Sequence, residues 1–346
     1  MKQLKLLTMI LISSLLLAAC GTNSQTEPNE ETDTIKKLQV DEDKPYIGFA
    51  MDTLQDERWY RDKDYFESTI KELGGNVKTL AANGIQSVQN EQVKLLIQEG
   101  IDVLVIIPTD ATEASEAVAL AKEANIPVIS YDKLVMDAPL DYYISFDNVK
   151  VGELQAQAIL EAAPAGKYAY VGGADSDNNA HLFREGAMNV LQPEIDAGNI
   201  ELVFDQFTDG WSPEVAESNM KNLLKTTDVD AVVAANDGTA GGVINALGET
   251  ILPVSGQDAE RDALQRIIDG TQTMTVYKSL ESIATTSAEV AIDLANGQSI
   301  ETTQSINNNQ VDVPAILLDP IAVDASNLEK TVISDGHIAK EDLNFN

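Results

Sequence analysis

Short apolar runs alternate with amphipathic stretches along the chain from Pro45 onward. In the first amphipathic stretch Phe66, Ile70 and Leu73 recur at helical spacing, and a pair of glycines ends the pattern. The same spacing predicts two more helices, from Val93, Leu96 and Ile97 and from Ala117, Val118 and Ala121. The apolar runs between them predict strands at 46–51, 76–82, 102–107, 127–131 and 142–146.

The alternation restarts after Asp147-Asn148, with a helix predicted from Val151, Leu154, Ala158 and Ile159. The second run predicts strands at 168–173, 200–205, 230–235, 251–256 and 273–277. Several of these runs are apolar on both faces, as parallel sheets covered by helices require. The pattern therefore predicts an α/β protein with two doubly wound lobes, each built on a mostly parallel sheet.

Polar residues and both tryptophans of the chain follow the predicted strands. Ligands of doubly wound sheets bind beyond the carboxyl ends of the strands, so these loops are where a site is expected. Carboxylates, amides and cations can bind adjacent sugar hydroxyls, and Trp can cover the apolar faces of a sugar ring. The loops contain residues 57–59 (ERW), 132–133 (DK), 147–148 (DN), 177–179 (DNN), 210–211 (GW), 236–237 (ND), 257–258 (QD) and Lys278.

The first twenty residues have the layout of a secretory signal, with two lysines before a mostly apolar stretch. That stretch is too short and too weakly flanked for a membrane span. It ends in LAAC at 17–20, which resembles a bacterial lipoprotein cleavage box and holds the only cysteine of the chain. We expect lipidation of Cys20 after removal of residues 1–19, with an ordinary cleaved signal as the alternative. Residues 20–44 are then a polar, lipid-anchored tether.

Composition excludes several classes of protein. The 44 % of apolar residues argue against wholesale disorder, and a net charge of −33 over 346 residues argues against a nucleic-acid partner. One cysteine and two histidines exclude a disulfide framework and most metal sites. The run 175–186 starts like a calcium loop, but Ala180 and Gly186 occupy the positions that need Gly and Glu. With no nucleophile–base pair in the sequence, we expect no enzyme activity, metal or cofactor.

Nine stretches that together span nearly the whole chain from about residue 44 carry a family resemblance. The most specific are YISFDN (143–148) and GTQTMTVYK (270–278). The sequence resembles the periplasmic-type sugar-binding proteins of ABC transporters, and specifically the D-xylose-binding branch of that family. The other stretches include ERWYRDKDYF (57–66), DNNAHLFREG (177–186), DGWSPE (209–214), DAVVAANDGTAGG (230–242) and SGQDAE (255–260).

The resemblance implies a type I periplasmic binding protein fold, in which the chain crosses three times between the lobes. It places the N-terminal lobe at 45–147 and 279–318, and the C-terminal lobe at 148–278 and 319–346. The implied function is capture of a monosaccharide, D-xylose or a similar sugar, and delivery to an ABC permease by a monomeric, membrane-anchored extracytoplasmic protein. The alternative is a receptor that presents the sugar to a sensor kinase or chemoreceptor. A transcriptional regulator would need a basic helix-turn-helix where this chain has a signal peptide.

The resemblance also implies which side chains contact the sugar. They are Arg58, Trp59, Asp132, Lys133, Asn179, Trp211, Asn236, Asp258 and Lys278. The family has Arg where this chain has Lys133, so the sequence departs from the family pattern at this contact. The segment 246–256 also looks shortened relative to the family.

Each of these residues has a simpler structural alternative. Either tryptophan could be a packing residue, and Asp132, Asn236 and Asp258 could each cap a helix. Asp147 and Asn148 fit a hinge as well as a ligand contact. His181 is expected at the surface or behind the ligand contacts.

Overall fold

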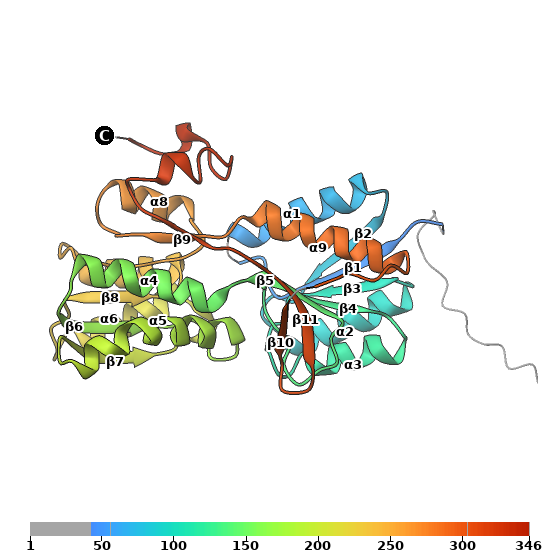
Figure 1. Cartoon of the computed structure of the whole chain (residues 1–346), viewed down its shortest axis with the longest axis horizontal. Coiled ribbons are helices and arrows are strands. Elements are labelled where there is room, and N and C mark those ends of the chain that lie inside the picture. Colours follow the sequence, from blue (N-terminus) through green and yellow to red (C-terminus); the bar gives the residue numbers. More distant parts are fainter. Residues whose placement is uncertain (1–42, 56, 303, 346) are drawn as a thin grey trace, which may run out of the picture. The chain divides into compact units, whose positions relative to one another are not determined.

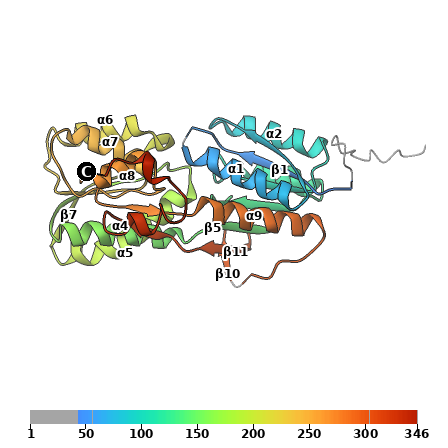
Figure 2. The ribbon, with the colours of Figure 1, turned by 90° about the horizontal axis from the view of Figure 1, so that it is seen from above.

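The computed structural model describes residues 43–55, 57–302 and 304–345, which belong to one unit of the chain, Ile35–Asn346. This unit consists of two lobes, each a sheet between layers of helices (Figures 1 and 2). In the described residues the chain crosses between the lobes three times, after β5, after β9 and after β11. The predicted α/β class with two doubly wound lobes is confirmed.

Within the described residues, seven strands form the first lobe's sheet in the order β10-β11-β5-β4-β3-β1-β2. Neighbours pair in parallel, except β10 and β11, which are antiparallel. The strands are β1 (Tyr46–Met51), β2 (Asn76–Ala81), β3 (Val103–Ile106), β4 (Val128–Tyr131), β5 (Tyr142–Phe146), β10 (Gln304–Asn307) and β11 (Asp312–Leu318).

Alternate residues of these strands belong to two different cores. Ala50 and Leu104 pack with α2 and α3, whereas Phe49 and Val105 pack with α1 and α9. Figure 1 shows these two helix pairs on opposite faces of the sheet. Burial on both faces is the physical reason why these strands read as continuous apolar runs. The helices are α1 (Glu57–Glu72), α2 (Gln86–Gln98), α3 (Ser115–Glu123) and α9 (Leu280–Ala295).

The second lobe is built on a smaller parallel sheet, with the strand order β7-β6-β8 among the described residues. Tyr168 and Tyr170 pack with α4 and α5, and Ala169 and Val171 pack with α6 and α7. Figure 2 shows the two helix pairs on opposite sides of this lobe. Its elements are α4 (Asn148–Ala162), β6 (Gly166–Val171), α5 (Asn178–Asp196), β7 (Ile200–Gln206), the 3-10 turn η1 (Asp209–Trp211), α6 (Pro213–Leu223), β8 (Ala231–Ala234), α7 (Asp237–Leu247), α8 (Arg261–Ile268) and β9 (Thr275–Tyr277).

Two glycines let α4 and α5 meet at backbone distance. A Cβ atom on Gly152 would lie 1.9 Å from the carbonyl oxygen of Phe183, and one on Gly186 would lie 1.9 Å from that of Val149. Any larger residue would force the helices apart. The close packing brings together the N-terminal turns of the two helices, which carry Asn148 and Asn179.

Two details of the sequence prediction are wrong. The segment 251–256 is not a strand, since it makes only an isolated bridge between Val254 and Val232, and Pro253 lacks the N–H that a strand would donate. Leu73 lies beyond the end of α1 and is 44 % exposed, so it does not share the buried face of Phe66 and Ile70.

The C-terminal segment packs on the second lobe. Its strand β12 (Ile321–Val323) pairs antiparallel with β9, and Leu328 and Val332 contact the cluster that includes Leu264 and Tyr277. Two 3-10 turns follow, η2 (Leu328–Lys330) and η3 (Lys340–Asp342). Among the helices of the described residues, none has the length and apolar character needed to span a membrane.

Candidate functional site

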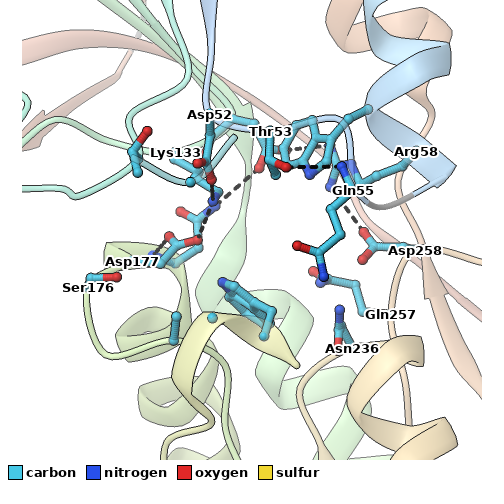
Figure 3. A pocket seen from close by; sticks show the side chains of 18 of the residues that line it. Asp52, Thr53, Gln55, Arg58, Lys133, Ser176, Asp177, Asn236, Gln257 and Asp258 are labelled. Atoms are coloured by element: carbon cyan, nitrogen blue, oxygen red, sulfur yellow. Dashed lines mark hydrogen bonds and ion pairs between the residues drawn. The ribbon is translucent and has the colours of Figure 1, made fainter. Parts of the chain in front are cut away.

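A pocket of about 270 Å³ is lined by loops that follow the strands of both lobes (Figure 3). The segments after β1, β2, β3 and β4 contribute from the first lobe, and those after β6, β7, β8 and β9, with residues 257–258, contribute from the second. All of the side chains expected from the sequence line it: Arg58, Trp59, Asp132, Lys133, Asn179, Trp211, Asn236, Asp258 and Lys278. The structure therefore brings the whole predicted set together; that these residues contact a sugar stays a prediction.

Arg58 joins carboxylates from both lobes. Its Nη2 lies 2.9 Å from Asp132 Oδ2 and its Nη1 lies 3.0 Å from Asp258 Oδ1, on the second lobe. Its Nε lies 3.3 Å from Asp62, one helical turn along α1, and Asp62 also accepts a hydrogen bond from the Tyr131 hydroxyl. The planar guanidinium has donors in fixed directions, so it can hold three carboxylates at once where an ammonium could not hold the same geometry.

Asp132 has an unusual backbone conformation, with φ at 58°, and lies 2 % exposed beyond β4. Its carbonyl oxygen accepts hydrogen bonds from Ser145 Oγ at 2.6 Å and from Asn179 Nδ2 at 3.0 Å. Burial alone would raise the pKa of Asp132, but Arg58 and Lys278 outweigh it and hold that pKa at about 2. The carboxylate is thus ionised at any physiological pH. No helix follows β4, so Asp132 is not a helix cap.

Lys133 bridges the two lobes rather than standing unpaired in the pocket. Its Nζ lies 2.8 Å from Asp52 Oδ2, after β1, and 3.2 Å from Asp177 Oδ2, in the second lobe (Figure 3). Burial alone would lower the pKa of Lys133, but Asp177 and Asp52 raise it above its ordinary value. Two of the three ammonium donors can be assigned to these carboxylates, which leaves one to reach a ligand.

The amides behind the pocket form a chain of hydrogen bonds. Asn148 Nδ2 donates to Asn179 Oδ1 at 2.9 Å, and Asn179 Nδ2 donates to the Asp132 carbonyl. Asp147 caps α4 by accepting from the Lys150 N–H at 3.0 Å, and neither Asp147 nor Asn148 lines the pocket. These contacts favour the hinge interpretation of 147–148 over a direct ligand contact.

The two tryptophans differ in their surroundings. Trp59 lies in the first turn of α1, is 5 % exposed, packs in the core cluster that includes residues of α1 and α9, and has the Arg58 guanidinium 4.3 Å from its ring centroid. Trp211 ends a turn with a φ of 58° and lies against Gly173, where a Cβ atom would come within 2.0 Å of the indole. Trp59 is thus both a packing residue and a pocket residue, and Gly173 is required for the position of Trp211.

In the second lobe the alternative role as a helix cap holds for one residue. Asn236 caps α7 by accepting from the Thr239 N–H at 2.9 Å, and it lines the pocket as well. Asp258 caps no helix, because Glu260 occupies the N-cap position of α8. Lys278 is 2 % exposed and lies 3.5 Å from Asp258 Oδ1.

Several pocket residues lie outside the set expected from the sequence. Asp52 and Thr109 follow β1 and β3 and could have been found by the strand-end rule that located the other residues. Gln257 was noted in its loop but was not assigned a contact. It is 2 % exposed and its Oε1 has no hydrogen-bond partner within the described residues. No sequence signal marks an unpaired acceptor of this kind.

The run 175–186 does not form one continuous loop. Most of 175–186 lies in α5, whose N-cap is Asp177, and within the described residues no group of three His, Cys, Asp or Glu is placed to hold a metal ion. His181 is exposed, with Nε2 2.8 Å from the Asp175 carbonyl, as expected of a surface residue. Cys20 lies outside the described residues.

Comparison with known proteins finds relatives over most of the chain. The periplasmic binding protein domain family matches residues 47–299. The D-xylose-binding periplasmic protein of Escherichia coli (strain K12) is 47 % identical over 86 % of this chain and 92 % of its own length. The D-xylose-binding periplasmic protein of Haemophilus influenzae is 46 % identical over 86 % and 91 %.

A solved structure shares the fold of this chain. The carbohydrate transporter solute-binding protein of Chloroflexus aurantiacus, in complex with D-glucose, has a TM-score of 0.81 at 32 % identity, over 86 % of this chain and 98 % of its own. The chain therefore belongs to the periplasmic sugar-binding protein family, with the type I periplasmic binding protein fold. Members of this family are extracytoplasmic binding proteins, so the prediction that the chain is not an enzyme is confirmed.

The Arg58 network gives a prediction about stability. Arg58→Met removes the cation that all three buried carboxylates contact, so the free energy of unfolding at pH 7 should fall by about 3–5 kcal/mol. Asp132 has a depressed pKa, so its contribution is present above pH 4 and is lost as pH falls toward 2. The difference from wild type in urea unfolding should therefore shrink below pH 4.

Arg261→Met is the matched control. Its guanidinium pairs with Asp262 at the surface, where both side chains are more than half exposed, and such pairs contribute about 0–1 kcal/mol. Equal effects of the two substitutions would contradict the assigned role of Arg58.

Proposed function

We propose that the chain is an extracytoplasmic solute-binding lipoprotein that captures a monosaccharide, D-xylose in the first place, and delivers it to an ABC permease. One observation carries this proposal: the nine side chains implied by the family resemblance converge from separate loops on one pocket. The relatives named as D-xylose-binding proteins, which cover most of this chain, support the choice of sugar.

The chemistry of the pocket suits a neutral sugar. Carboxylates, amides and cations supply acceptors and donors for hydroxyl groups, and two indoles supply apolar surface. The lining residues include five carboxylates, Asp52, Asp132, Asp177, Asp209 and Asp258, against three cations, Arg58, Lys133 and Lys278. Each of these cations already faces a carboxylate. An anionic ligand such as a sugar phosphate would therefore be repelled. The hydroxyl groups of a neutral polyol can instead donate hydrogen bonds to these carboxylates and accept them from these cations.

The proposed binding cycle is closure of the lobes around the sugar. The lobes are assigned as 45–147 with 279–318, and 148–278 with 319–346. A ligand drives closure only through a higher affinity for the closed form. Contacts to one sugar from Arg58 on the first lobe and Asp258 on the second would provide that difference. A sugar lacking one hydroxyl would leave a buried polar group unpaired, which makes discrimination steep.

Calorimetric titration against D-xylose, D-ribose, D-arabinose and D-glucose tests the proposal. We expect D-xylose to bind with the lowest dissociation constant and to change the tryptophan fluorescence. Trp211→Ala should weaken binding by about 3–5 kcal/mol, because it deletes an aromatic surface from the pocket. Tyr60→Ala, an exposed aromatic that does not line the pocket, is the control. Absence of binding to every sugar would refute the proposal.

The role of Lys133 can be tested in the same assay. Because its ammonium lies among pocket carboxylates with one donor left over, Lys133→Ala should weaken D-xylose binding by about 1.5–3 kcal/mol. Lys133→Arg, which restores the family residue, should bind at least as tightly as the wild type. Lys122→Ala removes a first-lobe lysine that pairs with Asp141 away from the pocket and should have no effect. An unchanged dissociation constant for Lys133→Ala would remove Lys133 from the site.

The membrane anchor is tested by Cys20→Ser. If Cys20 carries the lipid, the variant should leave the membrane fraction while the purified protein keeps its affinity for D-xylose. Fractionation and immunoblotting measure the first property, and titration measures the second. A variant that stays with the membranes as the wild type does would show that Cys20 is not the anchor.

A further inference from the structure

The pocket loop 257–260 is held in a strained conformation. Asp258 and Ala259 are adjacent non-glycine residues with φ of 98° and 52°, a region that L-residues rarely adopt. Such a conformation persists only where its surroundings impose it. In this loop the conformation places Asp258 Oδ1 3.0 Å from Arg58 Nη1 of the other lobe.

A buried carboxylate below the loop supplies the restraint. The backbone N–H of Asp237 donates to the Gln257 carbonyl at 2.9 Å, and its Oδ2 accepts from the Glu260 N–H at 3.0 Å. These two bonds hold both ends of the loop. Asp237 Oδ2 also accepts from the Thr275 hydroxyl at 2.9 Å, and Thr275 Oγ1 in turn accepts from the Ala259 N–H at 3.2 Å.

Asp237 is itself fixed on its other side. Its Oδ1 accepts from Gln272 Nε2 at 2.8 Å, and its carbonyl oxygen accepts from Arg266 Nη2 at 2.9 Å. Gly256 leaves room for the carboxylate, since a Cβ atom there would come within 2.0 Å of Oδ1. Asp237 is 1 % exposed and does not line the pocket, so it cannot contact a ligand directly.

We infer that Asp237 is a positioning residue for sugar binding, which holds the loop 257–260 so that Asp258 is presented to the ligand and to Arg58. The inference rests on the proposed sugar-binding function. It assigns to Asp237 a role in affinity although Asp237 is buried and does not line the pocket.

The protonation of Asp237 provides a specific readout. Burial, together with the charge of Asp258, raises the pKa of Asp237 to about 7, and Arg266 acts in the opposite direction. Among the residues that donate hydrogen bonds to the Asp237 carboxylate, Glu260 is charged, and Gln272 and Thr275 are neutral. The ionised carboxylate of Asp237 accepts hydrogen bonds from the Glu260 N–H, Gln272 Nε2 and the Thr275 hydroxyl. Protonation places a hydrogen on one carboxylate oxygen and so removes one of the positions that accept these bonds. The loop is therefore held best when Asp237 is ionised.

Affinity and stability should respond to pH in opposite directions. If only the ionised form presents the loop correctly, a pKa of about 7 makes D-xylose binding weaker at pH 6 than at pH 8 by up to about tenfold. The raised pKa has the reverse effect on folding: its contribution to stability is fully present below pH 4 and is lost as pH rises toward 7. A purely structural role would change stability without this slope in affinity.

The experiment compares wild type with Asp237→Asn by calorimetric titration with D-xylose at pH 6, 7 and 8. We expect Asp237→Asn to bind several-fold more weakly than wild type at pH 8 and to lose the wild-type pH slope, since the amide cannot ionise. Asp205→Asn makes the same chemical change on β7, where Asp205 pairs with Arg184 outside the pocket, and should keep the wild-type affinity and slope. Thermal unfolding of each variant is recorded alongside.

Thr275 provides a second test if Asp237→Asn does not fold. Thr275→Val removes the hydroxyl that links Asp237 to Ala259 and should weaken binding, and Thr275→Ser should restore it. Wild-type affinity with an unchanged pH slope in Asp237→Asn, or equal affinities for the two Thr275 variants, would overturn the inference. Failure of the wild type to bind any sugar would instead refute the proposed function.

Discussion

The guanidinium of Arg58 is the interaction on which the rest of the site depends. It is buried among Asp62, Asp132 and Asp258, and the last of these belongs to the other lobe. Buried charges are stable only when they are paired and hydrogen-bonded, so each partner fixes the others. A sugar hydroxyl that enters this network meets donors and acceptors whose directions are already set.

This preorganisation requires unfavourable backbone conformations at several pocket residues. Asp132, Trp211 and Asp258 line the pocket from three separate loops, and each has a positive φ. Non-glycine residues in that region cluster at functional sites because the surrounding structure must hold them there. For Asp258 the restraint is Asp237; for Trp211 it is the room that Gly173 leaves for the indole.

The ion pairs of Lys133 are a feature that the family resemblance does not predict. The resemblance implies a sugar contact at this position, but it says nothing of the two carboxylates that surround the ammonium. Asp52 follows β1 and Asp177 caps α5. They lie 81 and 44 positions from Lys133 in the sequence, yet both contact its ammonium. Replacement of the family Arg by Lys keeps the charge between the lobes while giving up the planar fork.

The pattern of apolar residues was sufficient to predict the two lobes, most of their strands and the loops that carry the site. Strands buried on both faces must be continuously apolar, and ligands of such sheets lie beyond the strand ends. The same pattern was misleading at 251–256, where Pro253 leaves only a single bridge, and at Leu73, which lies past the end of its helix. Pairings such as Lys133 with Asp177, or Asp237 with Glu260, could not be read from the chain. They depend on which loops the folded lobes bring within hydrogen-bond distance, and no local pattern of residues encodes that.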